Sequence, residues 1–364
     1  MNRSVVVAPD SFKGTISATE AATAIAAGWR SVWPDDNLIL LPQADGGEGT
    51  LDAIEAATAG AVRRSIADIS GPDSRQHAAR RHTGEWLELP GGTAVVELAQ
   101  CAGLPLMTSL DPLGATSRGL GDVIAAALAA GATSLVIGLG GSASTDGGAG
   151  ALEALGLRLL DVAGHPLPPG GAALAALDRI DASGLAGAPA GGVTLLTDVD
   201  APLLGPSGAA AVFGPQKGAL PREVALLDAA LERFALVVGG DPVMAGAGAA
   251  GGTAYGFVNL WGATVEPGAR RIAALSGLTQ ALDSADVVVT GEGRFDSQSL
   301  TGKVVGNVLA LAGTTTVGII AGAVDFDTET WTAALAELAG STDEAMANPA
   351  IWLEAAGALA ARNL

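Results

Sequence analysis

Short apolar runs that end in a polar, glycine-rich loop and lead into a helical pattern recur along the chain, and they constrain its fold most strongly. Residues 5–8 and 38–41 are such runs, and the first ends at Asp10. Between them, Ser17 and Glu20 form a capping-box pattern that predicts the start of a helix. Strands and helices that alternate with short connections predict parallel β/α units.

The carboxyl-terminal part returns to this rhythm after a middle part with a different pattern. Candidate strands at 287–289 and 316–320 flank a helical stretch, whereas residues 62–98 contain three short strand candidates that predict an antiparallel patch. We therefore expect an α/β protein with two domains. One is discontinuous and comprises residues 1–65 plus 266–364, and the other is an inserted mixed α/β domain of residues 66–265.

The charge balance narrows the possible partners. The chain has 19 Lys and Arg against 38 Asp and Glu, a net charge of −19, which disfavours binding to nucleic acids and to anionic membranes. With 49% hydrophobic and only 16% charged residues, a disordered chain is excluded. The first residues lack the apolar run of a signal peptide, so we expect a soluble cytoplasmic protein. Monomer and homodimer both stay open.

Lysine is rare and unevenly placed. Only three of the 19 cations are lysines, Lys13, Lys217 and Lys303, and each lies in a stretch that contains glycine. A lysine is a compact, mobile point charge that suits phosphate oxygens. Two explanations are open: a coding bias toward arginine, or lysines kept where arginine cannot substitute.

The strongest single stretch is residues 138–150, Gly-Leu-Gly-Gly-Ser-Ala-Ser-Thr-Asp-Gly-Gly-Ala-Gly. Glycines let backbone N–H groups approach an anion closely, and the helix that follows offers its positive end to phosphate. A tight turn between strand and helix is the alternative explanation. The acidic partner of a dinucleotide fingerprint is not evident, which disfavours nicotinamide binding, and the chain has no Walker-type P-loop.

Isolated carboxylates follow several of the predicted strands. They are Asp10, Asp45, Glu48, Asp198, Glu292 and Asp296. In open parallel sheets ligands bind outside the carboxyl ends of the strands, so these side chains and the lysines form a candidate site. Oxygen ligands without a His or Cys cluster favour Mg²⁺ over Zn²⁺. Such a set suits phosphoryl transfer, and the residues alone predict a nucleotide-dependent kinase or another phosphate-handling enzyme.

Eight motifs, in order along residues 5–325, resemble those of type I glycerate kinases. They are Ala8-Pro-Asp-Ser-Phe-Lys-Gly14, Ala44-Asp-Gly-Gly-Glu-Gly-Thr50, Thr116-Ser-Arg-Gly119, the loop from Gly140 to Gly150, Thr197-Asp-Val-Asp-Ala-Pro-Leu203, Phe213-Gly-Pro-Gln-Lys-Gly218, Gly246-Ala-Gly-Ala-Ala-Gly-Gly252 and Thr290-Gly-Glu-Gly-Arg-Phe-Asp-Ser-Gln-Ser299. The resemblance implies Mg²⁺-assisted, ATP-dependent phosphorylation of D-glycerate, usually to 2-phosphoglycerate. It also implies a flavodoxin-like (Rossmann-like) parallel-sheet domain from both chain ends, an inserted domain similar to restriction endonucleases, and an active site in the cleft between them.

The candidate residues take three predicted roles on these motifs. The predicted catalytic residues are Asp45, Asp198, Lys217 and Asp296, with Asp198 favoured as the base because it ends a strand of the middle domain. The predicted glycerate-binding residues are Asp10, Lys13, Arg118, Glu292 and Ser297, with Arg118 on the carboxylate. The predicted ATP-binding residues are Gly140, Gly141, Ser142, Asp146 and Lys303, and Asp198 and Asp296 are the predicted Mg²⁺ ligands.

Alternatives stay open for the function and for single residues. A kinase for another small hydroxy acid, a glycerate 3-kinase and a nucleotide-binding regulator without turnover are the other candidates. Helix caps or turns are the alternative roles of the carboxylates, and a structural ion pair is that of Arg118. The chain also departs from the family pattern in its tail, which looks shortened; the last strand is not evident near residues 336–340, so we expect an edge strand to be lost or replaced.

Overall fold

The chain forms two compact units. The computed structural model describes residues 2–73, 81–300 and 302–364. One unit comprises Met1–Asp45, Gly49–Ala59 and Pro267–Leu364, and the other comprises Gly46–Glu48 and Gly60–Glu266. Both chain ends therefore belong to the first unit. The domain limits drawn from the sequence, at residues 65/66 and 265/266, stay a prediction.

The first unit holds a five-stranded parallel sheet built from both chain ends. Its strands are β1 (Ser4–Val7), β2 (Asn37–Leu40), β11 (Val287–Phe295), β12 (Thr316–Val324) and β13 (Trp331–Ala334). They lie in the order β13-β12-β11-β1-β2, and every neighbouring pair is parallel, as the sequence predicts. Counted along the chain within this unit, the order is 2-1-3-4-5. Ligands bind doubly wound sheets where such an order reverses, which here is between β1 and β11.

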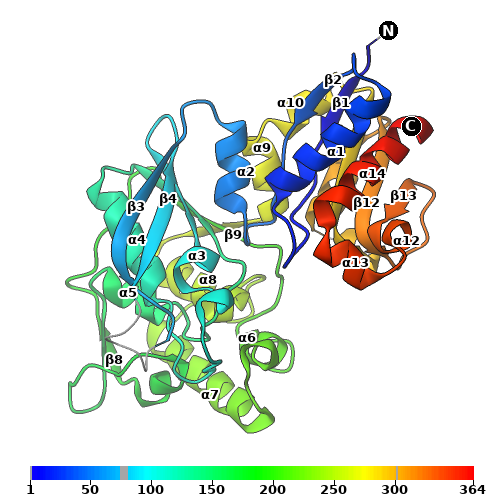
Figure 1. The fold of residues 1–364 in the computed structure, drawn as a ribbon. Helices are drawn as coiled ribbons and strands as arrows, with labels where there is room; N and C mark the ends of the chain where they lie inside the picture. Colours follow the sequence, from blue (N-terminus) through cyan, green and yellow to red (C-terminus); the bar gives the residue numbers. More distant parts are fainter. Residues whose placement is uncertain (1, 74–80, 301) are drawn as a thin grey trace. The chain divides into compact units, whose positions relative to one another are not determined.

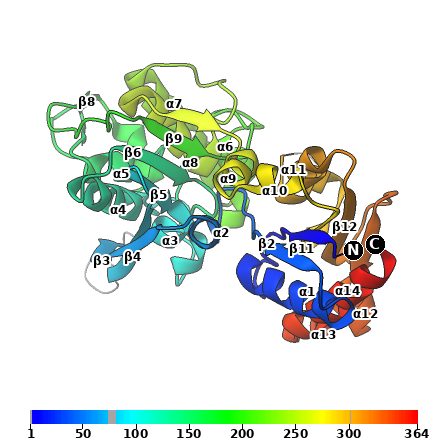
Figure 2. The same ribbon diagram turned by 90° about the horizontal axis from the view of Figure 1, so that it is seen from above.

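Helices cover both faces of this sheet (Figures 1 and 2). They are α1 (Ala18–Val32), α2 (Thr50–Ala57), α9 (Gly268–Leu275), α10 (Leu278–Leu282), α11 (Val304–Ala312), α12 (Leu335–Ala339), α13 (Thr342–Ala347) and α14 (Pro349–Asn363). Val5 and Val7 pack with α1 and α14, whereas Val6 packs with α9, α10 and α11. Burial on both faces is why the strands are continuous apolar runs. The predicted capping box of Ser17 and Glu20 is present at the start of α1.

Two glycines let α1 and α14 approach each other closely, and Figure 2 shows these helices side by side. A Cβ added at Gly28 would lie 1.9 Å from the carbonyl oxygen of Glu354. A Cβ added at Gly357 would lie 2.2 Å from the carbonyl oxygen of Ile25. The contact between the two helices is therefore made by backbone, and neither glycine can gain a side chain without moving a helix.

We expect Gly28→Ala to lower the free energy of unfolding by about 2 kcal/mol, because overpacking costs about 3 kcal/mol and the better helix propensity of alanine offsets only about 1 kcal/mol. Urea unfolding measures the loss. Ala27→Ser, at an exposed position of the same helix, is the control. Equal unfolding midpoints for the two variants would contradict the close contact.

An edge strand, β13, lies just before residues 336–340, where the family's last strand is not evident. β13 pairs in parallel with β12, with Trp331 opposite Gly318. A Cβ at Gly318 would lie 3.2 Å from the ring of Trp331, so the indole packs on the bare glycine. Residues 336–339 belong to α12 instead. The expectation that the family's edge strand is lost or replaced stays a prediction. Trp-Thr-Ala-Ala is a weak strand pattern, and pairing with β12 and packing outweigh it.

β11 is longer than predicted, which changes the setting of its motif. The sequence predicts a strand at 287–289 that ends in a loop, but β11 stays paired with β12 until Phe295 lies opposite Val324. Glu292 therefore projects from a strand of the sheet and not from a loop. The backbone of the motif is fixed by the hydrogen bonds of the sheet.

The second unit is built on a six-stranded mixed sheet. In spatial order its strands are β10 (Thr264–Glu266), β9 (Val193–Leu196), β6 (Ser134–Gly138), β5 (Thr93–Glu97), β4 (Arg81–Glu88) and β3 (Val62–Ser70). The first four are parallel to one another, whereas the β5–β4 and β4–β3 pairs are antiparallel, as the pattern in residues 62–98 predicts. A separate hairpin pairs β7 (Arg158–Leu160) with β8 (Arg179–Asp181).

Figure 1 labels the α-helices of the second unit. They are α3 (Leu98–Ala102), α4 (Arg118–Ala129), α5 (Ala149–Ala154), α6 (Ala209–Phe213), α7 (Pro221–Val238) and α8 (Ala249–Trp261). One continuous apolar cluster, which includes Leu120, Ile137 and Phe257, joins α4, α8 and the sheet. None of the helices in the described part of the chain combines the length and the apolar character that crossing a membrane requires.

Candidate active site

Three carboxylates gather in the first unit, two of them beyond the carboxyl ends of β1 and β2 and the third within β11. Asp10 follows β1, Asp45 follows β2, and Glu292 lies on β11. Asp10 and Glu292 are each only 8% exposed. The Asp10 N–H donates to the carbonyl of Gly291 at 2.8 Å, which holds the loop after β1 against β11. Residues from three separate sequence motifs therefore meet where the strand order reverses, the place at which such sheets bind ligands.

The surroundings of Asp10 give it a proton affinity that the sequence did not reveal. Burial and the charge of Asp45 raise the pKa of Asp10 to about 7, with a smaller contribution from Glu292. The Ser11 N–H and the charge of Lys13 oppose the rise. A carboxyl group with a pKa near neutrality can accept and release a proton at working pH, as general acid–base catalysis requires.

The same cluster contains hydrogen-bonding atoms that are not satisfied. Among the described residues, Oε1 of Glu292 and Oγ of Ser11 are buried without a hydrogen-bond partner. Burial raises the pKa of Glu292, while a hydrogen bond from Ser299 and the charge of Lys303 lower it. Buried polar atoms are normally paired in folded proteins. Two unpaired atoms next to Asp10 therefore mark a place that a polar ligand can complete.

Three more predicted site residues, Asp296, Ser297 and Lys303, follow the end of β11 along the chain. Asp296 accepts the Gln298 N–H at 2.8 Å, which is a turn-forming bond. Ser297 is exposed on the one-turn helix that begins there, and Lys303 is the cap residue before α11. A turn, the alternative role of the carboxylates, fits the backbone of Asp296, and Lys303 caps α11. The charges of both residues also act on Glu292. Their roles toward glycerate, ATP and Mg²⁺ stay predictions.

In the second unit, the glycine loop after β6 is organised around Asp146. Its buried carboxylate accepts six hydrogen bonds of 3.5 Å or less, from the hydroxyls of Thr116, Ser117 and Ser144 and from the N–H groups of Ser117, Gly148 and Gly150. Asp146 is a predicted ATP-binding residue, yet both of its oxygens bond within the protein. Sequence reasoning missed Ser117, although its place beside Arg118 in a motif was a usable signal.

The three other loop residues predicted to bind ATP differ in their contacts and in their exposure to solvent. The Gly140 N–H donates to the Gly46 carbonyl at 3.0 Å, and a Cβ at Gly140 would lie 2.4 Å from the Cα of Gly47. Position 140 therefore requires glycine, because the backbone of this loop touches the backbone of the loop at Gly46 and Gly47. Ser142 is buried and donates to a carbonyl within the loop at 3.2 Å. Gly141 is exposed, so it is the part of the predicted phosphate cradle that faces solvent.

Lys217 lies behind this loop and is almost completely buried. Its ammonium group donates to the carbonyl of Ser144 and lies 3.4 Å from Oγ of Ser142. Burial lowers the pKa of Lys217 to about 8, and the charge of Asp146 opposes that shift. Gly251 supports the loop from another side, since a Cβ there would lie 2.2 Å from the Ser144 oxygen. The lysine therefore holds the loop and places a positive charge directly beneath it.

The remaining predicted residues of the second unit are Arg118 and Asp198. Arg118 is the exposed first residue of α4, and its charge acts on Glu153 of α5. Burial raises the pKa of Glu153 to about 7, and Arg118 opposes the rise. Sequence reasoning missed this acidic neighbour. Asp198 is half-buried, two residues beyond the end of β9.

The predicted Mg²⁺ ligands, Asp198 and Asp296, belong to different units. Within residues 2–73, 81–300 and 302–364, no group of three or more Asp, Glu, His or Cys side chains could hold a metal ion. A kinase usually holds Mg²⁺ with one or two carboxylates together with substrate phosphates and water. The isolated carboxylates of this chain suit a metal ion that arrives with a nucleotide.

Phosphoryl transfer relies on positioning and on charge stabilisation, and carboxylates, lysines and a glycine loop are the groups that supply them. Together with the doubly wound sheet, these groups define a phosphotransferase of the kinase class. Residues 5–364 match the sequence model of the Glycerate kinase family. The chain belongs to the glycerate kinase family.

Named relatives agree with this assignment. The chain is 41% identical over 309 residues to "Glycerate 2-kinase" of Escherichia coli K12, which covers 82% of this chain and 79% of that protein. It is 42% identical over 309 residues, with the same coverage, to "Glycerate kinase" of Bacillus subtilis 168. The crystal structure of a putative glycerate kinase 2 from Salmonella typhimurium LT2 is similar with a TM-score of 0.79, 36% identity and full coverage of both chains.

Proposed function

We propose that this chain transfers the γ-phosphoryl group of ATP to a hydroxyl of D-glycerate and forms 2-phosphoglycerate. The observation that carries the proposal is the cluster of buried Asp10 and Glu292 with half-buried Asp45 at the reversal of strand order. The charges of Lys13 and Lys303 act on this cluster. The kinase class follows from the family. The choice of the 2-position is supported by the name of the Escherichia coli relative.

Asp10 is the proposed general base. In the transfer, the acceptor oxygen bonds to the γ-phosphorus while the bond from the γ-phosphorus to the bridging oxygen of ADP breaks, and the hydroxyl proton passes to a base. A base works best when its pKa lies near the operating pH, and burial raises the pKa of Asp10 to about 7. Asp198, which the sequence favours, is the second candidate.

The cations would then neutralise the two anionic substrates. Lys13 and Lys303 would face the acceptor and the transferred phosphoryl group, and Arg118 would bind the glycerate carboxylate through two N–H groups. Gly141 and the positive charge of Lys217 would favour the ATP phosphates. Mg²⁺, held by Asp198 or Asp296, would neutralise charge on the phosphate oxygens.

A coupled assay of ADP release, run with ATP, Mg²⁺ and D-glycerate, tests this function. We expect turnover, and ³¹P NMR of the product should show 2-phosphoglycerate. A product phosphorylated at the 3-position would show that the protein is a glycerate 3-kinase. Faster turnover of another small hydroxy acid, in a panel with L-glycerate and glycolate, would show that glycerate is not its preferred substrate. Nucleotide binding without ADP release in the presence of any acceptor would favour a nucleotide-binding regulator without turnover.

The finer structural expectations also belong to this proposal. The first unit is proposed to be flavodoxin-like, because the 2-1-3-4-5 order of its parallel sheet is that of flavodoxin-like folds. The likeness of the second unit to restriction endonucleases rests on the family resemblance alone. A cytoplasmic location stays a prediction, and light scattering of the purified protein would separate monomer from homodimer.

A further inference from the structure

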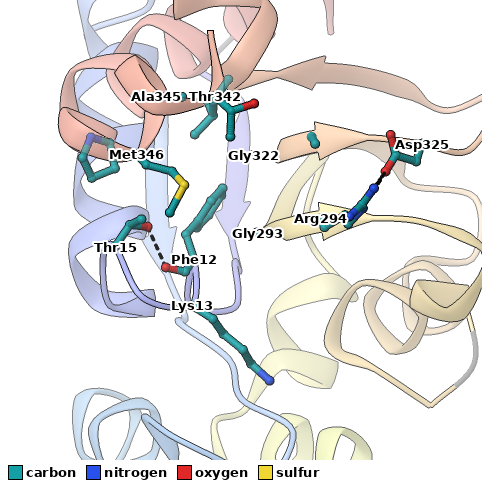
Figure 3. Close-up of a pocket in the computed structure, with 13 residues that line it drawn as sticks. Phe12, Lys13, Thr15, Gly293, Arg294, Gly322, Asp325, Thr342, Ala345 and Met346 are labelled. Atoms are coloured by element: carbon teal, nitrogen blue, oxygen red, sulfur yellow. Dashed lines mark hydrogen bonds and ion pairs between the residues drawn. The ribbon is translucent and has the colours of Figure 1, made fainter. Parts of the chain in front are cut away.

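A pocket of about 430 Å³ lies in the first unit (Figure 3), and Gly293, which follows Glu292 in the sequence, is one of its lining residues. Phe12 from the loop after β1, Leu335 from α12 and Met346 from α13 supply its apolar wall. Figure 3 shows Phe12 and Met346 next to each other on one side of the pocket. A cavity of this size and apolar character is typical of small-molecule sites.

The floor of the pocket is backbone, and one of its two glycines is not explained by the fold. Gly322 is required by packing, because a Cβ there would lie 2.4 Å from the carbonyl oxygen of Gly293. At Gly293 the nearest atom to an added Cβ would be the backbone nitrogen of Lys13 at 3.6 Å, an ordinary contact. No strained backbone requires glycine at 293 either, since its φ is not positive. A side chain at Gly293 would be tolerated by the chain but would occupy the pocket.

The polar groups of the pocket lie at its rim. Arg294 and Asp325 form an ion pair across the ends of β11 and β12, opposite the Phe12 wall in Figure 3. Thr342, the first residue of α13, adds a hydroxyl. Lys13 lines the pocket, and Figure 3 shows its ammonium group pointing away from the Phe12 wall. Apolar walls with a few polar groups at the edge suit a flat heteroaromatic ring.

We infer that this pocket binds the base and ribose of the purine nucleotide that donates the phosphoryl group. A ring stacked near Phe12 and Met346 gains aromatic and sulfur contacts, and a carboxylate such as that of Asp325 has lone pairs left to accept from an exocyclic amine. A three-carbon acid is too small and too polar to fill the same space. The Phe12-Lys13 backbone then runs from the base to the Asp10 cluster, where transfer is proposed.

This inference rests on the proposed function for the identity of the nucleotide, and nucleotide binding without an acceptor tests it. Met346→Trp would fill the pocket from α13, whereas Asp343→Trp would place the same side chain on the exposed side of that helix. Isothermal titration with ADP, without glycerate, should give a dissociation constant for Met346→Trp that is about tenfold or more weaker than for Asp343→Trp. Inorganic tripolyphosphate, which lacks a base, should bind the two variants equally.

Other results would overturn the inference. ADP binding of equal strength in the two variants would exclude the base from this pocket. A raised KM for glycerate with unchanged ADP binding would assign the pocket to the acceptor. Equal weakening of tripolyphosphate would show that the substitution acts on the phosphate site. A wild-type protein that binds ADP in this pocket but does not phosphorylate glycerate would overturn the proposed function and leave the pocket assignment standing.

Discussion

Asp10→Asn is expected to lower kcat with D-glycerate by about 10²- to 10⁴-fold, the usual contribution of a general base. Asparagine keeps the size and the buried position of the side chain but cannot take the hydroxyl proton. The KM for glycerate should change far less than kcat. Steady-state ADP release at saturating ATP measures both constants.

The control for this substitution is Asp35→Asn, at an exposed position of the same unit. It should keep the parent rate. A rate for Asp10→Asn within about tenfold of the parent would remove Asp10 as the base. Asp198→Asn is then the variant to measure, since Asp198 is the base that the sequence favours.

The pH dependence of the parent enzyme should report the same group. Because burial and Asp45 raise the pKa of Asp10 to about 7, kcat/KM should fall about tenfold per pH unit below that value, as the base becomes protonated. The profile of Asp10→Asn should lose this limb. A parent profile that is flat between about pH 5 and pH 8 would contradict the role.

Stability should change with pH in the direction set by the same shift. The folded pKa of Asp10 is about 7 and the ordinary value is 3.8, so the folded state binds more protons between these values. This carboxyl group therefore lowers the free energy of unfolding progressively as pH rises from about 4 to about 7. Asp10→Asn should gain stability over the parent at about pH 8 and much less at about pH 4, as measured by urea unfolding.

Asp146→Ala is expected to destabilise the second unit by about 4 kcal/mol or more and to abolish turnover. It removes the acceptor of six hydrogen bonds at once. Each buried donor left without a partner costs about 1–3 kcal/mol, although relaxation of the loop recovers part of the sum. A loss of this size is a large fraction of the about 5–15 kcal/mol by which domains are stable.

Asp181→Ala is the matched control, because Asp181 also accepts a backbone N–H, that of Ser183, but near the surface. Its cost should be much smaller, because water can replace the lost hydrogen bonds at the surface. If Asp146→Ala does not fold, Asp146→Asn is the variant to measure. Asparagine keeps the shape of the side chain and one of its two acceptor oxygens, so the thermal midpoint of this variant should lie below that of the parent. Full stability of Asp146→Asn together with lost ATP binding would make Asp146 a direct ATP contact instead.

The candidate residues separate into those that sequence spacing could place and those that it could not. Asp10 and Glu292 were found because they lie at the ends of predicted strands, and the parallel sheet brings such positions together. The roles of Asp146 and Lys217 were not accessible in this way. Both side chains are buried and bonded to segments distant in sequence, such as Ser117 for Asp146 and Ser144 for Lys217.

By itself the sequence determined the alternation of strands and helices, the parallel sheet from both chain ends and the family, because these depend on local periodicity and on ordered motifs. The tertiary structure alone decided which polar groups are buried, which hydrogen bonds they make and where a backbone contact requires glycine. Asp10 acquires a pKa of about 7 because it is buried and because Asp45 and, to a smaller extent, Glu292 lie beside it. Position 322 requires glycine and position 293 does not, because the Gly293 carbonyl of β11 lies against Gly322 of the neighbouring strand β12. The burial and the contacts of a side chain depend on segments that are far apart in the sequence, so a local sequence pattern cannot predict them.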